Sequence, residues 1–179
     1  MPAIPHYVFQ PANGAVLGGE IDWTKGVVLK PITGQNARGV QLLFDQQKAI
    51  DTGRLGRHWT VSPLMSIVSE VRVVLLDGEV MLCFTKRPVM VNGLKIFFIS
   101  KEAPIEHVLT FGEEAMARAA QEAIGLRVCA VDLAVLESGE TKVLEVNSSI
   151  TLWPYALHSE KHAARAKAVY EKIVKAMFT

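Results

Sequence analysis

Short runs of apolar and β-branched side chains, bounded by glycine, proline and aspartate, recur along the chain and predict β-strands. Two such runs, residues 71–76 and 79–85, are separated only by Asp77 and Gly78. An Asp-Gly pair between two strand-like runs is the strongest short signal for a β-hairpin, because both positions of the turn need a positive φ. We therefore expect an antiparallel hairpin in the middle of the chain.

The second half of the chain carries further clear signals. Residues 128–137 and 141–147 predict another hairpin around Ser138-Gly139. Before it, residues 110–126 predict a helix with Thr110 as N-cap and Glu113 completing a capping box. A C-terminal helix is predicted from about residue 159 to residue 177.

The first half is less regular. We expect a buried strand over residues 26–30, stopped by Pro31, and a second strand over residues 40–44. Residues 1–22 are rich in proline and glycine and predict irregular structure or a short edge strand, and residues 52–59 predict an exposed loop. The order of strands and helices, with hairpins dominating, is typical of an α+β fold with antiparallel sheets.

The geometry of the last hairpin brings acidic residues together. With a loop of Ser138 and Gly139, Asp132 pairs with Glu145, and Asn147 lies on the same face because side chains alternate along a strand. Facing carboxylates repel unless a cation lies between them, and such hard oxygen ligands suit Mg²⁺, or Mn²⁺, carrying phosphates. The alternative is a solvated acidic strand face without a ligand. The same pairing predicts an apolar layer on the opposite face, formed by Val131, Leu133, Val135, Leu144 and Val146.

The central hairpin supplies positive charge. With Asp77-Gly78 as its loop, Arg72 and Arg87 converge at the open end of one face. Arginine makes bidentate contacts to phosphate and keeps its charge, so both are candidate phosphate-binding residues. The alternative is a surface pair of Glu70 with Arg72 and no ligand. The same register predicts an apolar opposite face made by Val71, Val73, Leu75, Val80, Leu82 and Phe84.

A third feature is Lys30 at the end of a predicted strand, followed by a loop that Gly34 and Gly39 bracket. Glycines let backbone N–H groups approach a phosphate, and the lysine adds a point charge. The spacing is not that of a Walker loop, because Val40 stands where the lysine is required and no helix follows. The alternative is a simple turn.

Composition and net charge argue against some classes of binding partner and indicate a cellular compartment. Nineteen basic and eighteen acidic residues leave a net charge of +1, which gives no broad attraction to nucleic acid or to an acidic membrane. Cys83 and Cys129 lie within apolar runs and suit buried thiols in a reducing compartment. No signal peptide and no membrane-spanning segment is predicted, so we expect a cytoplasmic protein without nucleic-acid or membrane partners.

Together these features resemble the ATP-grasp superfamily, most of all the branch that contains glutathione synthetase and the ribosomal-protein glutamate ligases. The resemblance extends from about residue 27 to residue 149. The matching positions, in chain order, are Lys30, the loop 34–40, the strand Glu70-Val71-Arg72, Arg87, Asp132, Glu145 and Asn147.

The resemblance implies one ATP-grasp-like domain over residues 1–179, built of two lobes of antiparallel sheet with packed helices that hold ATP between them. We expect an irregular segment to residue 25, a small glycine-loop lobe over about residues 26–68, and a larger lobe with the metal site over about residues 69–179.

The resemblance also implies roles for individual residues. Arg72 and Arg87 would be catalytic, and Asp132, Glu145 and Asn147 would bind Mg²⁺. The residues that would bind ATP are Lys30, Gly34, Gln35, Asn36, Ala37, Arg38, Gly39 and Val40.

The expected activity is ligation of a carboxylate to an amine or a thiol, dependent on Mg-ATP and passing through an acylphosphate, with a small-molecule or peptide carboxylate as substrate. Little sequence precedes Lys30, so the family's N-terminal substrate domain and the first of its two ATP-contacting lysines have no counterpart. A homo-oligomer or a partner subunit is expected to supply that part. The alternative is a non-catalytic ATP-binding regulatory or assembly module, and a third hypothesis is a kinase or nucleotidyltransferase with the same lobes.

Overall fold

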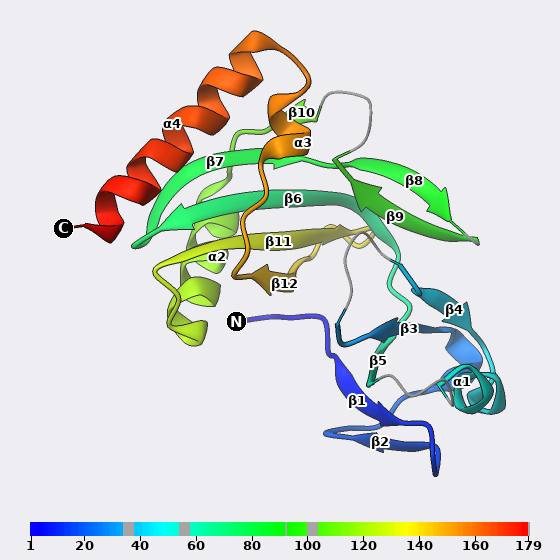
Figure 1. Cartoon of the computed structure of the whole chain (residues 1–179). Coiled ribbons are helices and arrows are strands. Elements are labelled where there is room, and N and C mark those ends of the chain that lie inside the picture. The colour runs from blue at the N-terminus through cyan, green and yellow to red at the C-terminus, as the bar shows by residue number, and fades with distance from the viewer. Residues whose placement is uncertain (34–37, 54–57, 92, 100–103, 179) are drawn as a thin grey trace. The chain divides into compact units, whose positions relative to one another are not determined.

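The computed structural model describes residues 1–33, 38–53, 58–91, 93–99 and 104–178. The chain forms two compact units (Figure 1). Unit 1 contains Met1–Ala3, Ile67–Pro88 and Phe97–Thr179, and unit 2 contains Ile4–Ser66 and Val89–Ile96. Both units are built on antiparallel sheets with packed helices, so the predicted α+β class is confirmed.

Unit 1 is a five-stranded antiparallel sheet in the order β10-β7-β6-β11-β12. Its strands are β6 (Ile67–Leu76), β7 (Glu79–Thr85), β10 (Ile105–Glu106), β11 (Val128–Leu136) and β12 (Thr141–Asn147). Both predicted hairpins are present, as β6–β7 and β11–β12. The turn between β6 and β7 has positive φ at Asp77 and at Gly78, as the Asp-Gly signal required.

Helices cover both faces of this sheet (Figure 1). Helix α2 (Phe111–Ile124) packs on one face, whereas α3 (Trp153–Ala156) and α4 (Glu160–Met177) pack on the other. Helix α2 begins with the predicted capping box of Thr110 and Glu113 and ends at Gly125 in the left-handed conformation. None of the helices within the described residues is long and apolar enough to cross a bilayer.

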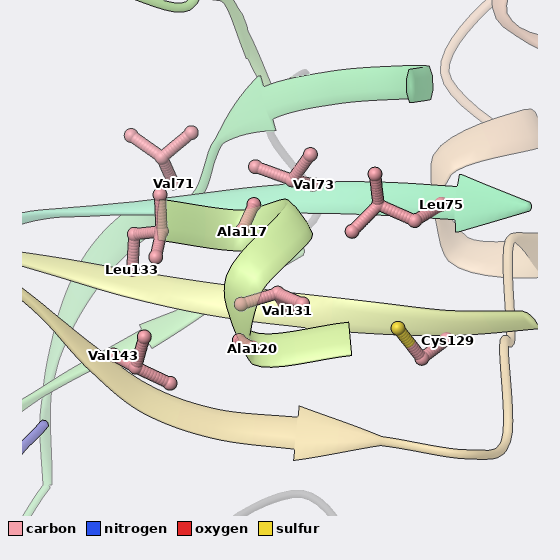
Figure 2. Packing of buried hydrophobic residues seen from close by; sticks show 9 residues of the cluster. All are labelled: Val71, Val73, Leu75, Ala117, Ala120, Cys129, Val131, Leu133 and Val143. Carbon is pink, nitrogen blue, oxygen red and sulfur yellow. The ribbon is translucent and has the colours of Figure 1, made fainter. Parts of the chain in front are cut away.

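The apolar cluster under α2 consists of small and branched side chains that are almost fully buried (Figure 2). Ala117 and Ala120 of α2 let the helix approach the sheet closely, because neither side chain extends beyond Cβ. The residues that they meet are Val71, Val73, Leu75, Cys129, Val131, Leu133 and Val143.

The β6–β7 pairing differs from the prediction at one place. From the turn outward the strands pair as a two-residue loop requires as far as Leu75. The next pair joins Val74 to Leu82 and leaves Met81 as an extra residue, which is a β-bulge. Leu82 and Phe84 therefore lie with Val74 on the face of α3 and α4, and the prediction that they share the face covered by α2 is wrong.

The β11–β12 pairing reaches the predicted register by another route. The connection between the two strands spans residues 137–140 and is longer than predicted. An irregularity in β12, with Leu144 as the extra residue, offsets this difference, so Asp132 still pairs with Glu145. Val143, not Leu144 as predicted, takes the core position on the α2 side.

Unit 2 is a second five-stranded antiparallel sheet in the order β2-β1-β5-β3-β4. Its elements are β1 (Tyr7–Gln10), β2 (Ala15–Leu17), a short 3₁₀ helix at Trp23–Lys25, β3 (Val27–Pro31), β4 (Gln41–Leu43), α1 (Gln46–Gly53) and β5 (Trp59–Pro63). Strands β8 (Arg87–Val91) and β9 (Leu94–Phe98) form a separate two-stranded sheet.

Two predictions for unit 2 need correction. Residues 1–22, expected to be irregular or a short edge strand, contain the β1–β2 hairpin, and β1 lies inside the sheet between β2 and β5. Residues 52–59, expected to be an exposed loop, end at Trp59, which begins the inner strand β5 and is only 3% exposed. Phe9 and Trp59 pair across the strands and belong to the core of unit 2.

Candidate functional site

A group of charged side chains gathers on the face of the unit 1 sheet that carries α3 and α4. Strands β6, β11 and β12 supply most of it, and the residue that follows β7 completes it. We call this group the charged cluster; its members are Glu70, Arg72, Lys86, Asp132, Glu145 and Asn147.

Asp132 lies at the centre of the charged cluster and is 0% exposed. Arg72, its register partner on β6, donates from Nε to Oδ1 at 2.8 Å and from Nη2 to Oδ2 at 2.7 Å. This bidentate arrangement is the strongest and most directional pairing available to a carboxylate and a guanidinium. Arg72 is therefore held in one orientation by a carboxylate that has no contact with solvent.

Lys86 is the second cation of the cluster. Its Nζ lies 2.9 Å from Oδ2 of Asp132 and also forms an ion pair with the Glu70 carboxylate. The backbone N–H of Lys86 donates to the carbonyl of Glu70 at 2.9 Å, which fixes the point from which the side chain extends. Lys86 and Glu70 are 6% and 5% exposed, so this pair is almost completely removed from water.

Asn147 joins the two carboxylates that the sequence placed opposite each other. Its Nδ2 donates to Oδ2 of Asp132 at 3.2 Å and to Oε1 of Glu145 at 3.0 Å. The structure thus brings Asp132, Glu145 and Asn147 together on one face, as predicted. Glu145 and Asn147 are half-buried, so the cluster is more open to solvent on the β12 side.

The pKa values of the two most buried carboxylates, Asp132 and Glu70, shift in opposite directions. Burial raises the pKa of Asp132, but the hydrogen bond from Arg72 and the charge of Lys86 outweigh burial and hold that pKa below its usual range. Burial raises the pKa of Glu70 to about 7, and the charges of Asp132 and Glu145 add to this shift while Lys86 opposes it. Asp132 is therefore ionised at neutral pH, whereas Glu70 exchanges a proton near neutral pH.

The donor set of the charged cluster suits a hard divalent cation. Asp132, Glu145 and Asn147 offer carboxylate and amide oxygens, which are the ligands that Mg²⁺ prefers. Within the described ranges, no three or more histidine, cysteine, aspartate and glutamate side chains are grouped so that they could hold a metal. If a cation binds here, the side chains would offer it two carboxylates and one amide, and phosphate or water would complete its coordination.

The loop residues that were predicted to bind ATP belong to unit 2. Lys30 lies on β3 and pairs with Thr60 of β5. Arg38, Gly39 and Val40 form the turn before β4. Gly39 has a φ of +83°, and a Cβ at this position would meet Cγ of Pro31 at 3.0 Å, so the turn requires glycine.

The other predicted loop residues, Gly34, Gln35, Asn36 and Ala37, lie outside the described residues. The predicted roles of Lys30 and of the loop 34–40 therefore stay predictions.

The strand pattern of the sequence predicts Arg87, and not Lys86, on the face of Arg72. The structure differs because of the bulge at Met81: it reverses the alternation of side chains along β7, so that Phe84, and Lys86 two residues beyond it, lie on the face of Arg72. Arg87 instead begins β8, and its predicted contact with ATP stays a prediction. A signal for Lys86 was present, because a lysine at the end of a buried strand needs an anionic partner.

Comparison with solved structures shows the same fold in ATP-grasp enzymes. D-cycloserine synthetase DcsG matches with a TM-score of 0.61 and 18% identity over 96% of this chain and 65% of that chain. The ATP-grasp ligase PsnB, solved with a minimal precursor, Mg and ADP, matches with a TM-score of 0.60 and 15% identity over 93% of this chain and 54% of that chain. The D-alanine–D-alanine ligase of Bacillus anthracis, solved with ATP, matches with a TM-score of 0.54 and 14% identity over 83% of this chain and 48% of that chain.

The chain spans about half the length of the PsnB chains that it matches. A search of curated proteins gave no match. The sequence itself matches a protein family, described as an ATP-grasp domain and numbered family 3 of its clade, over residues 33–169. This match covers most of the chain and includes Arg72, Asp132, Glu145 and Asn147. The chain therefore belongs to the ATP-grasp superfamily, in this family of ATP-grasp domains.

Proposed function

We propose that this chain binds Mg-ATP at the charged cluster and uses it to activate a carboxylate as an acylphosphate, which an amine or a thiol then attacks. The observation that carries the proposal is the convergence of Asp132, Glu145 and Asn147 with Arg72 and Lys86 on one sheet face. Membership of the ATP-grasp superfamily supports it.

In the proposed reaction the charged cluster would act mainly by stabilising negative charge. Transfer of a phosphoryl group spreads negative charge over its oxygens, so catalysis depends on positioning and on fixed positive charge. Arg72 supplies a guanidinium whose orientation Asp132 already fixes, and Lys86 supplies a compact ammonium beside it. A bound Mg²⁺ would neutralise further phosphate charge, and Asp132, Glu145 and Asn147 are the residues that would hold it.

We further propose that Lys30 and residues 34–40 of unit 2, together with Arg87, contact the phosphates of ATP. The positive φ of Gly39 supports this role, because a backbone of this kind presents N–H groups to an anion. Lys30→Met should then raise the Kd for ATP, and Lys25→Met, at a lysine whose side chain is 83% exposed, should not. An unchanged Kd in Lys30→Met would remove Lys30 from the site.

A small-molecule or peptide carboxylate is the substrate class that we propose. Two matched structures support this range: PsnB was solved with a precursor peptide, and DcsG is a D-cycloserine synthetase. Sedimentation of the chain with and without Mg-ATP tests whether it also acts as a homo-oligomer.

The test of the proposal is a turnover assay on the full chain. Mg-ATP is incubated with pools of amino acids and short peptides, and the release of ADP and phosphate is measured. We expect release that depends on one pool and that falls at least about tenfold in Glu145→Gln, a loss of about 1.4 kcal/mol of transition-state stabilisation. Glu140→Gln, at an exposed glutamate on the same hairpin, is the matched control and should keep full activity.

The outcome of this assay also distinguishes ligation from the alternative functions. Saturable binding of ATP without turnover of any pool would favour a non-catalytic regulatory or assembly module. A product that carries phosphate or AMP on a hydroxyl or a lysine would identify a kinase or a nucleotidyltransferase. The mass of the product distinguishes these outcomes from ligation.

A further inference from the structure

Protein donors already saturate Oδ2 of Asp132, the most buried acidic residue of the charged cluster. Oδ2 accepts one hydrogen bond from Arg72 and one from Asn147 and contacts the ammonium of Lys86, and Oδ1 accepts the second hydrogen bond from Arg72. An ionised carboxylate offers about four lone-pair positions. Oδ2 has about two of these positions and already meets three donors, so it has none left for a metal ion, whereas Oδ1 accepts only from Arg72.

Lys86 is the donor that a metal would have to displace. Arg72 holds Asp132 through two parallel hydrogen bonds, whereas Lys86 makes one contact, through a compact ammonium on a flexible four-carbon stem. Because the backbone N–H of Lys86 is tied to Glu70, the ammonium can move away without disturbing the strand pairing. Withdrawal of Lys86 opens Oδ2 of Asp132 next to Glu145 and Asn147.

The balance of charge explains when such a displacement is favourable. Glu70, Asp132 and Glu145 carry three negative charges when ionised, and Arg72 and Lys86 carry two positive ones, which leaves one net negative charge. If Lys86 stayed in place, a divalent cation would leave one net positive charge in the cluster; if Lys86 withdrew, its ammonium would lose its contact with Asp132, which is costly for a charge removed from water. A cation that arrives with a triphosphate brings negative charge for the displaced ammonium to pair with.

We propose that Lys86 is the internal counter-cation of the charged cluster and holds it closed to free divalent metal, so that metal binds only together with a nucleotide. This inference rests on the proposed function, because it takes Asp132, Glu145 and Asn147 as the metal ligands. It assigns to Lys86 a second task besides contact with phosphate. It also accounts for a lysine that is almost fully buried beside two carboxylates.

The test measures metal binding without any turnover. Mn²⁺ serves as the probe, because it takes the same oxygen ligands as Mg²⁺ and the paramagnetic resonance signal of the free ion falls on binding. Wild-type protein should show no saturable Mn²⁺ binding without nucleotide. Lys86→Met should bind Mn²⁺ at least about tenfold more tightly than wild type, equivalent to about 1.4 kcal/mol.

Two further variants control this experiment. Lys161→Met makes the same substitution at an exposed lysine that pairs with exposed Glu106, and it should behave as wild type. Because Lys86→Met leaves two buried carboxylates without their ammonium, Lys86→Met/Glu70→Gln is measured beside it. The double variant removes one negative charge with little change of shape, and it should also gain Mn²⁺ binding. Circular dichroism establishes that each variant is folded.

Saturable binding of Mn²⁺ to wild type without nucleotide, as tight as in Lys86→Met, would overturn the inference. So would the absence of any gain in a folded Lys86 variant. The proposed function fails separately: wild type that binds neither Mn-ATP nor Mg-ATP contradicts the nucleotide site itself. Wild type that binds free Mn²⁺ and Mn-ATP equally well contradicts only the role of Lys86.

Discussion

Both faces of the unit 1 sheet contain fully buried side chains, but these side chains differ in chemistry. On the face under α2, Val73, Leu75 and Val131 are 0% exposed and meet only apolar neighbours in their cluster. On the opposite face, Asp132 is also 0% exposed, but it is surrounded by Arg72 and Lys86. The same strands, β6 and β11, supply both sets, because successive side chains point to opposite faces.

This difference separates residues that stabilise the fold from residues that have another task. Burial of apolar side chains contributes directly to the free energy of folding. Burial of an ion pair costs desolvation that the attraction between the charges only roughly offsets, so well-packed apolar residues would stabilise the sheet as well or better. The charged cluster is therefore expected to stabilise the fold less than apolar residues would, and its presence supports a binding or catalytic role.

The largest expected effect is that of Asp132→Ala. The substitution leaves Arg72 and Lys86 buried beside each other without their shared anion. Loss of one member of a buried ion pair costs about 3–5 kcal/mol, so the unfolding free energy measured with urea should fall by roughly 4 kcal/mol. Arg127→Ala breaks the exposed pair with Asp77 without changing a residue of the positive-φ turn, and should cost at most about 1 kcal/mol. Equal losses in the two variants would show that burial does not control the effect.

Leu75→Ala probes the apolar face at a distance from the charges. Leu75 is fully buried under α2, and truncation of such a leucine costs roughly 2–5 kcal/mol. Differential scanning calorimetry should show a lower Tm, while the Kd for Mg-ATP measured well below that Tm should stay within about twofold of wild type, a difference of under about 0.5 kcal/mol. A large loss of nucleotide affinity would mean that the two faces do not act separately.

Thr110→Ala should have a smaller effect on the same face. The Thr110 hydroxyl accepts from the backbone N–H of Glu113 at 3.2 Å, and Glu113 accepts in return from the backbone N–H of Thr110 at 2.8 Å. Loss of an N-cap costs typically about 1 kcal/mol. Urea titration measures the loss, and Thr110→Ser, which keeps the hydroxyl, should restore most of it. An Ala variant as stable as wild type would show that the capping box does not contribute.

Much of the fold of unit 1 could be predicted because its signals are local. Asp77-Gly78 and Ser138-Gly139 identify the two hairpins, and Thr110 with Glu113 identifies the start of α2. Strand alternation also placed Asp132, Glu145 and Asn147 on one face, but the predicted register is correct only because the longer loop and the irregularity at Leu144 offset each other. The hairpin and helix signals involve residues close together in the sequence, so a single sequence is enough to recognise them.

The features that could not be predicted depend on pairing between strands. The extra residues Met81 and Leu144 have no marker in the sequence, since neither is a glycine or a proline. The bulge at Met81 reverses the faces of the residues beyond it, so strand alternation alone could not predict that Lys86 lies on the face of Arg72. Trp59 was placed in a loop because its neighbours are glycine-rich and basic, whereas pairing with β1 and β3 makes it the start of an inner strand.

Glu145→Gln has the smallest expected effect on stability and the most direct bearing on function. Glu145 is half-buried and faces Asp132, so removal of its charge relieves repulsion and should change the unfolding free energy by less than about 0.5 kcal/mol. The decisive measurement is the Kd of wild type, Glu145→Gln and Glu140→Gln for Mg-ATP by calorimetry. A rise in Kd of about tenfold or more in Glu145→Gln alone, equivalent to about 1.4 kcal/mol, is the result that we predict. Equal Kd values in all three proteins would contradict the assignment of the charged cluster as the site for metal and nucleotide.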